Sequence, residues 1–164
     1  MHHADVPQVE LDGGHGWLFA GELDGMTSPA RADTPLIGLD LTLQRGTSIV
    51  PTSTTFEYAV VPLDGRVRVG PEVVEEGWLA LVPPGIDELP LEVSGDGARL
   101  LVLGGVPLGE RIEMWWNFVA RDKTEMTTAW QDWRDRTERF GDVDSALPRI
   151  AAPRPPWLPA RDDE

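Results

Sequence analysis

The sequence lacks cysteine altogether, so neither disulfide bonds nor thiolate chemistry contributes to this protein. No apolar run approaches the roughly 18 residues that span a membrane. The first residues, MHHADVPQVELDGG, show neither the basic start nor the apolar stretch of a signal peptide. Basic residues are scarce: 14 Lys and Arg stand against 28 Asp and Glu, a net charge of −14. This charge disfavours direct contact with nucleic acids or anionic membranes, so we expect a cytoplasmic protein without either partner.

Alternating apolar residues indicate β-strands over most of residues 17–119. In residues 36–43 and 89–93, apolar and polar side chains alternate, which is typical of strands with one buried face. Residues 78–82 (WLALV) and 99–105 (RLLVLGG) are continuous apolar runs, which predict strands covered on both faces. Turn-forming Gly and Pro residues separate these segments, and the length of 164 residues suits one domain. The pattern predicts an all-β fold, either an antiparallel sandwich or a barrel.

One α-helix is predicted near the C-terminus, over about residues 122–140. Asp122 and Glu125 suit an N-cap and its capping-box partner, and Gly141 is a natural stop. Apolar residues recur at helical spacing along one face: Met126, Ala129, Trp130, Trp133 and Phe140. This large aromatic stripe indicates that the helix packs on another part of the protein, most simply its own barrel.

A proline-rich segment follows the predicted helix. Residues 144–164 contain five prolines, which prevent regular secondary structure. We predict an extended tail here, with Ile150 or Trp157 as candidate anchors. The expected organisation is therefore a domain over residues 1–143 and a tail over residues 144–164.

Glycines and a proline recur with a spacing known from one β-barrel family. Gly46 and Gly65 bracket the stretch GTSIVPTSTTFEYAVVPLDG, and Gly77, Pro83 and Gly85 follow downstream. This spacing resembles the two motifs of cupins, which are double-sheet jelly rolls. The resemblance implies a cupin fold whose pocket lies at the residues within these two motifs.

In cupins the two motifs carry histidines and a glutamate that bind a metal ion. Here those positions fall on Thr52, Thr54, Tyr58 and Glu88. Because residues two apart on a strand point the same way, Thr52 and Thr54 are expected to keep the geometry without the ligands. A threonine hydroxyl is a weak neutral donor and a phenol has a reference pKa of about 10, which leaves Glu88 as the one good ligand. We expect a degenerate pocket of Thr52, Thr54, Phe56, Tyr58 and Glu88 without a metal cofactor; iron is the alternative.

The three histidines do not replace the missing ligands. His2 and His3 lie in the N-terminal segment, and His15 lies in a Gly-rich turn (DGGHG). None of them matches a motif position, so we expect solvated side chains.

The segment after the predicted barrel carries a longer and more specific motif. GGVPLGE (residues 104–110) and MWWNFVAR (residues 114–121) resemble the C-terminal half of pirin-family proteins, as does GELDGMTSP (residues 21–29). The resemblance covers about residues 5–143. It implies one half of a two-cupin protein, in which iron belongs to the N-terminal cupin. The family's activities, quercetin dioxygenation and iron-dependent transcriptional co-regulation, depend on that half, so no catalytic residue is assigned here.

Three hypotheses for function follow. The first is a non-catalytic cupin domain that acts through a homodimer or a protein partner. Its expected interface consists of aromatic residues: Trp115, Trp116, Phe118, Trp130 and Trp133. The alternative is that Trp115 and Trp116, which are neighbours in the sequence, are both buried within the monomer. The second is a ligand-binding or metal-dependent cupin enzyme, similar to a quercetin dioxygenase, with the degenerate pocket as its site for a small molecule. The third, a regulatory role, would have to act through proteins because of the negative charge.

Overall fold

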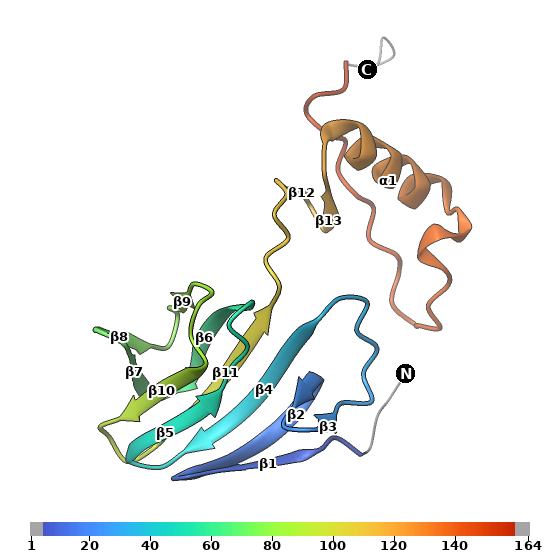
Figure 1. The fold of residues 1–164 in the computed structure, drawn as a ribbon. Helices are drawn as coiled ribbons and strands as arrows, with labels where there is room; N and C mark the ends of the chain where they lie inside the picture. Colours follow the sequence, from blue (N-terminus) through green and yellow to red (C-terminus); the bar gives the residue numbers. More distant parts are fainter. Residues whose placement is uncertain (1–4, 160–164) are drawn as a thin grey trace. The chain divides into compact units, whose positions relative to one another are not determined.

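The computed structural model describes residues 5–159, and its contacts divide the chain into two compact units, Met1–Pro107 and Leu108–Glu164. Figure 1 shows the first unit as two β-sheets and the second as a short hairpin with a helix. The division after Pro107 differs from the predicted boundary at residue 143. The reason is that the segment after Pro107 packs its aromatic side chains against one another. The predicted all-β fold with one C-terminal helix is confirmed.

The larger sheet of the first unit is antiparallel throughout. Within residues 5–159 its strand order is β1 (Gln8–Leu11), β2 (Gly14–Leu23), β4 (Leu36–Leu43), β11 (Ala98–Gly105), β6 (Glu57–Asp64) and β9 (Ala80–Val82), and β3 (Met26–Thr27) pairs with β2. The smaller sheet has the order β5 (Gly46–Pro51), β10 (Glu88–Val93), β7 (Arg66–Val69) and β8 (Glu72–Glu75). This non-sequential order in two facing sheets is that of a jelly roll.

The core of the first unit follows from alternation along the strands. On β4, Leu39, Leu41 and Leu43 are almost completely buried, as the pattern of residues 36–43 predicts. Gly38 lies on the opposite face of β4 and is nevertheless buried, because the ring of Phe19 covers it. A Cβ atom at Gly38 would lie 2.4 Å from that ring, so a larger residue here would have to displace the Phe19 side chain. Burial of each leucine contributes about 1.5–3 kcal/mol to stability.

The two continuous apolar runs do not form strands covered on both faces, and that prediction was wrong. In the first run only Ala80–Val82 is a strand, and Leu81 is 77% exposed. In the second run Leu100 and Val102 are buried, whereas Leu103 is 38% exposed. The physical reason is that both strands belong to a sheet whose inner face alone is covered within the first unit, and β9 is also its last strand.

The second unit combines a hairpin, β12 (Glu113–Trp115) and β13 (Phe118–Ala120), with helix α1 (Lys123–Asp135) and the 3-10 turn η1 (Glu138–Phe140). The carboxylate of Asp122 accepts hydrogen bonds from the backbone nitrogens of Thr124 (2.8 Å) and Glu125 (2.9 Å), which confirms the predicted N-cap. The Glu125 carboxylate reaches the backbone nitrogen of Arg121 rather than that of the cap residue. The helix ends earlier than predicted because Arg136 adopts a left-handed conformation.

The proline-rich segment has no strand or helix within residues 144–159 and packs on α1. The indole nitrogen of Trp157 donates a hydrogen bond to the hydroxyl of Thr127 (2.9 Å), and that of Trp133 donates to the backbone oxygen of Ile150 (2.9 Å). Both predicted anchors therefore hold the segment, although Ile150 does so through its backbone. No helix in the described part of the chain has the length and apolar character needed to cross a membrane.

Candidate functional site

Gly46, Gly65, Gly77, Pro83 and Gly85, whose spacing resembles the two cupin motifs, make up the predicted cupin frame, and its four glycines all occupy conformations that favour glycine. Gly46, Gly65, Gly77 and Gly85 have φ values of +133°, +74°, +84° and +119°. At Gly65, in the turn between β6 and β7, a Cβ atom would also lie 2.6 Å from the backbone oxygen of Gly97. The backbone nitrogen of Gly85 donates a hydrogen bond to the oxygen of Thr54 (2.9 Å). The frame thus joins the loop after β5 to the loop after β9.

Thr52 and Thr54 do not lie on a strand. Strand β5 ends at Pro51, and the two threonines belong to the following loop and turn. The expectation that they keep the same-face geometry of a strand is therefore wrong. The backbone nitrogen of Thr52 donates a hydrogen bond to the oxygen of Asp87 (2.9 Å), and its hydroxyl donates to the oxygen of Ile86 (2.9 Å). Thr52 is occupied in joining two loops.

Tyr58 fills the position where the cupin glutamate would lie. Its side chain is 2% exposed, and its phenol oxygen accepts a hydrogen bond from the backbone nitrogen of Ser53 (2.7 Å). Burial raises the pKa of the Tyr58 phenol above its ordinary value of 10.0, an effect that the hydrogen bond from Ser53 offsets in part. The phenol is consequently neutral at physiological pH and a poor ligand for a metal ion. The ring of Phe56 lies 6.1 Å from that of Tyr58.

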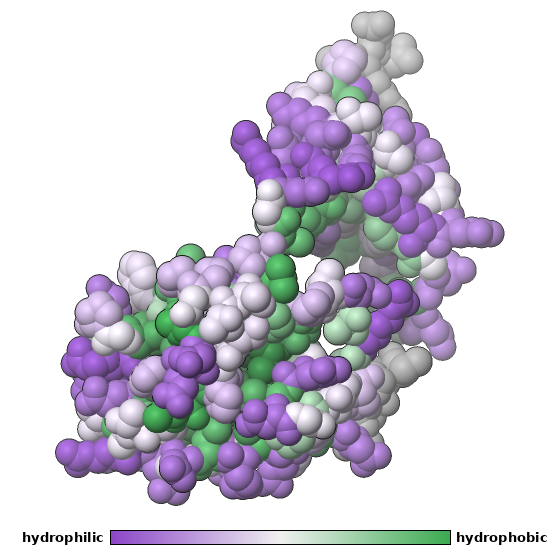
Figure 2. All heavy atoms as spheres, viewed as in Figure 1, coloured by the Kyte–Doolittle hydropathy of each residue, from purple (hydrophilic) through white to green (hydrophobic). Residues whose placement is uncertain are grey.

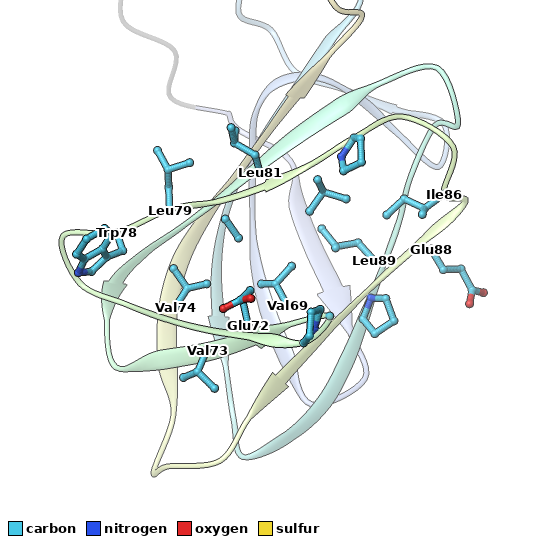
Figure 3. Close-up of a pocket in the computed structure, with 16 residues that line it drawn as sticks. Val69, Glu72, Val73, Val74, Trp78, Leu79, Leu81, Ile86, Glu88 and Leu89 are labelled. Carbon is cyan, nitrogen blue, oxygen red and sulfur yellow. The ribbon is translucent and has the colours of Figure 1, made fainter.

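Glu88 lies at the start of β10, opposite Pro51, and its side chain is exposed. Figure 3 shows its carboxylate pointing away from the neighbouring apolar side chains. Across the described residues, no three His, Cys, Asp or Glu side chains are placed to hold one metal ion. His15 is exposed on β2, and His2 and His3 lie outside the described residues. The side chains at the cupin positions therefore do not fit iron or a similar metal ion.

The five predicted interface aromatics lie together in the second unit. Phe118 and Trp130 are buried, and Trp115, Trp116 and Trp133 are half-buried around them. Ring centroids are 5.7 Å apart for Trp116 and Trp133 and 5.6 Å apart for Trp115 and Trp157, within the range of favourable aromatic contacts. Trp116 has a φ of +53° in the turn after β12, so the two adjacent tryptophans do not alternate along one strand. Phe118 and Trp130 are thus buried within the second unit, and the interface expected at these five aromatics stays a prediction.

An apolar groove in the first unit was missed by the sequence reasoning. It lies between β8, β9 and β10, has a volume of about 660 Å³, and is lined by residues 69–74, 78–83, 86 and 88–90. Figure 3 shows these side chains on the strands and connecting loops. Trp78, Leu79 and Leu81 are 73%, 53% and 77% exposed, and Figure 2 shows apolar residues open at the surface of this unit. The available signal was the run WLALV, which the pattern assigned to the interior.

The border of the apolar groove is acidic. Glu72 and Glu88 line it directly, and Glu75 and Glu76 lie three and two residues before Trp78 in the sequence. All four carboxylates are exposed. Among the described residues that line the groove there is no Lys, Arg or His. The groove therefore combines an apolar surface with negative charge at its edge.

Two facing antiparallel sheets joined through this glycine frame define a cupin β-sandwich. The sequence model of the pirin C-terminal cupin domain matches residues 38–141, and the chain belongs to the pirin family through this domain. The resemblance inferred from the residues of GGVPLGE and MWWNFVAR is thereby confirmed. The comparison concerns the C-terminal cupin alone.

Relatives of known sequence and structure agree with this assignment. A Pseudomonas aeruginosa protein provisionally named quercetin 2,3-dioxygenase is 40% identical over 158 residues, which is 95% of this chain and 50% of that protein. A pirin-like protein of Caulobacter vibrioides is 30% identical, over 87% of this chain and 50% of the relative. The crystal structure of quercetin 2,3-dioxygenase from Acinetobacter baumannii is 33% identical, with a TM-score of 0.82 over 98% of this chain and 54% of that one. The chain spans about half the length of these relatives.

Proposed function

We propose that this chain is a non-catalytic cupin domain that acts through protein contacts. The proposal rests on the side chains that occupy the cupin ligand positions. Thr52 is hydrogen-bonded to a neighbouring loop, and Tyr58 is a buried neutral phenol hydrogen-bonded to the backbone of Ser53. Glu88, the one carboxylate, is exposed at the start of β10. These side chains offer no ligand set for a metal-dependent reaction.

The apolar groove supports the second part of the proposal. Three large apolar side chains within four residues, Trp78, Leu79 and Leu81, are more than half exposed. Clusters of this kind mark interaction sites more often than scattered surface leucines do. A tryptophan at the centre of such a surface is a common source of binding energy in protein interfaces. The partner is a second copy of the chain or a different protein.

A metal-dependent enzyme is the second candidate, and the names of two relatives favour it. The Pseudomonas and Acinetobacter relatives are both named for quercetin dioxygenation, but this chain covers only about half of either. For this activity to reside here, the cupin positions would have to bind iron with Thr52, Thr54 and Tyr58 in place of histidines and glutamate. The donor atoms of these side chains argue against it.

Two measurements on the purified full chain test the proposal. Protein prepared with added Fe(II) and no chelator is analysed for metal content and then incubated aerobically with quercetin, whose absorbance is followed. We expect substoichiometric metal, the same in wild type and in Glu88→Ala, and no quercetin consumption above that with added Fe(II) alone. The proposal would be overturned in favour of the enzyme if wild type contained one equivalent of iron, if Glu88→Ala contained less, and if quercetin were consumed.

A further inference from the structure

We propose that the apolar groove binds an extended segment of a different protein, in which apolar side chains are flanked by lysine or arginine. This inference rests on the proposed function and specifies the chemistry of the partner. It is built on three properties of the groove: the strand edges beside it, the exposed tryptophan and leucines, and the charge of its border.

The groove lies beside two terminal strands. Within the described part of the chain, β8 pairs with β7 alone and β9 pairs with β6 alone, so each ends its sheet. One edge of each strand therefore has backbone N–H and C=O groups that no neighbouring strand uses. An incoming extended segment can pair with such an edge and place alternate side chains into the adjacent pocket. Both strands are short, four and three residues, which suits a short segment.

The side chains along the groove suit an apolar segment. Trp78 precedes β9 and Leu81 lies on it, and Val73 on β8 is 51% exposed. Beneath them, Ala80, Val82 and Ile86 are partly buried and pack on the core of the first unit, so the floor of the groove is fixed by that packing. A tryptophan and a leucine on a fixed floor can bury most of their surface against two or three apolar side chains of the partner.

The charge of the border decides between partners. Glu72, Glu76 and Glu88 form no ion pair within residues 5–159, and the nearby Arg68 is paired with Glu92 (3.4 Å). A second copy of the chain would bring a second acidic border against the first, in a protein whose net charge is −14. A segment with Lys or Arg on either side of its apolar residues would complement the border. The charge therefore favours a different, basic protein over self-association.

The experiment uses the full chain and three fluorescein-labelled, end-capped peptides. The first, KKVLVLKK, has an apolar centre with basic flanks; EEVLVLEE reverses the flank charge; KKSGSGKK removes the apolar centre. Fluorescence anisotropy measures the affinity of each for wild type, Trp78→Ala, Leu81→Ser and the double variant Glu72→Gln/Glu88→Gln. The replaced side chains are exposed, so folding should be retained. Asp12→Asn is the matched control, because it removes a negative charge in the exposed turn between β1 and β2.

We expect KKVLVLKK to bind about tenfold or more tightly than either other peptide. Trp78→Ala and Leu81→Ser should each weaken this binding about tenfold, and the double glutamate variant should weaken it and reduce its dependence on salt. Asp12→Asn should bind like wild type. Equal binding of the lysine- and glutamate-flanked peptides, binding unchanged in Trp78→Ala, or no binding of KKVLVLKK would overturn the inference.

Light scattering on the same samples separates this inference from the proposed function. A dimer that Leu81→Ser converts to a monomer would show that a second copy occupies the groove. That result would overturn the basic partner, while the proposed function through protein contacts would stand. Stoichiometric iron with quercetin turnover would instead remove the proposed function, whatever the peptides do.

Discussion

The phenol oxygen of Tyr58 lies 2.7 Å from the backbone nitrogen of Ser53 and accepts its hydrogen bond. This bond fastens the loop after β5 to the first residues of β6, inside the jelly roll. The Tyr58 side chain is almost completely buried, so water has little access to this hydrogen bond. The phenol is therefore the hydrogen-bond acceptor that satisfies the N–H group of Ser53. At the position of a cupin metal ligand, the chain thus carries a residue that stabilises a loop.

Tyr58→Phe should therefore destabilise the protein while keeping the size and shape of the ring. The change leaves the backbone N–H of Ser53 without its acceptor, which typically costs about 1–3 kcal/mol. Urea unfolding of the two proteins measures the difference. Ser53→Ala is the control, because it keeps the Ser53 N–H and removes only the hydroxyl's local hydrogen bonds to Thr55 (2.9 and 3.4 Å), so its cost should be smaller than that of Tyr58→Phe. Equal stability of Tyr58→Phe and wild type would contradict a structural role for this bond.

The pH dependence of stability should reflect the same side chain. Burial raises the pKa of Tyr58 above 10.0 in the folded protein, so the unfolded chain loses its phenol proton at a lower pH than the folded one. The contribution of Tyr58 is thus complete below pH 10 and is lost as the pH rises through the folded-state pKa. Since Tyr58 is the one tyrosine in the sequence, its phenolate absorbance can be titrated directly. A midpoint below 10.0 in the folded protein would contradict the burial seen here.

An ion pair on the outer face of the large sheet should make the stability of the protein fall as the pH is lowered. The Arg99 guanidinium donates hydrogen bonds to both carboxylate oxygens of Asp40 (3.0 and 2.7 Å), and these bonds hold the pKa of Asp40 below 3.8. Its stabilisation is present above pH 3.8 and is lost as the pH falls through the lowered pKa. Both side chains are partly exposed, so Asp40→Asn should lower Tm by only a few degrees at pH 7.

Thermal unfolding followed from pH 7 to pH 2 checks this prediction. The Tm values of wild type and Asp40→Asn should converge as the pH falls, because protonation of Asp40 removes its ion pair with Arg99. Glu92→Gln, which loses the longer and more exposed pair with Arg68, is the control and should differ less from wild type at pH 7. A difference between wild type and Asp40→Asn that persists unchanged at pH 2 would exclude the ion pair as its cause.

The parts of the fold that sequence could predict are those set by local chemistry. Alternation placed Leu39, Leu41 and Leu43 in the core, because successive residues on a strand point to opposite faces. The glycine spacing located turns that need positive φ angles, as at Gly65 and Gly85. Asp122 was identified as the N-cap because its carboxylate can reach the first free N–H groups of the helix.

The parts that sequence could not predict depend on distant neighbours. Hydrophobicity alone assigned Trp78 and Leu81 to the interior, but the place of β9 at the end of its sheet leaves them open. The spacing of the cupin motif predicts Thr52 and Thr54 as strand residues, but β5 ends at Pro51 and both threonines lie in the following loop, which is hydrogen-bonded to the distant residues Ile86 and Asp87. The partner of Trp157, the hydroxyl of Thr127, lies 30 residues earlier in the chain.

Trp157 provides a test of how the proline-rich segment is held. Trp157→Ala removes the hydrogen bond to Thr127 and the edge contact with the Trp115 ring, and we expect a loss of about 1–3 kcal/mol in the second unit. Near-ultraviolet circular dichroism during urea unfolding reports this, because five of the seven tryptophans lie after residue 107. Leu147→Ala, at an 80% exposed position in the same segment, should have little effect. Similar losses in both variants would show that Trp157 is not a specific anchor.

Two leucines of the first unit give a matched test of the apolar groove. Leu81 is 77% exposed and Leu91 is completely buried, so the same truncation to alanine should have different effects at the two positions. Leu91→Ala should cost about 2–5 kcal/mol because it leaves a cavity between the sheets. Leu81→Ala should stay within about 0.5 kcal/mol of wild type at low protein concentration. Urea unfolding at several concentrations measures both values. If Leu81→Ala costs as much as Leu91→Ala even at the lowest concentration, its side chain is covered in the folded chain and is not free to bind a partner.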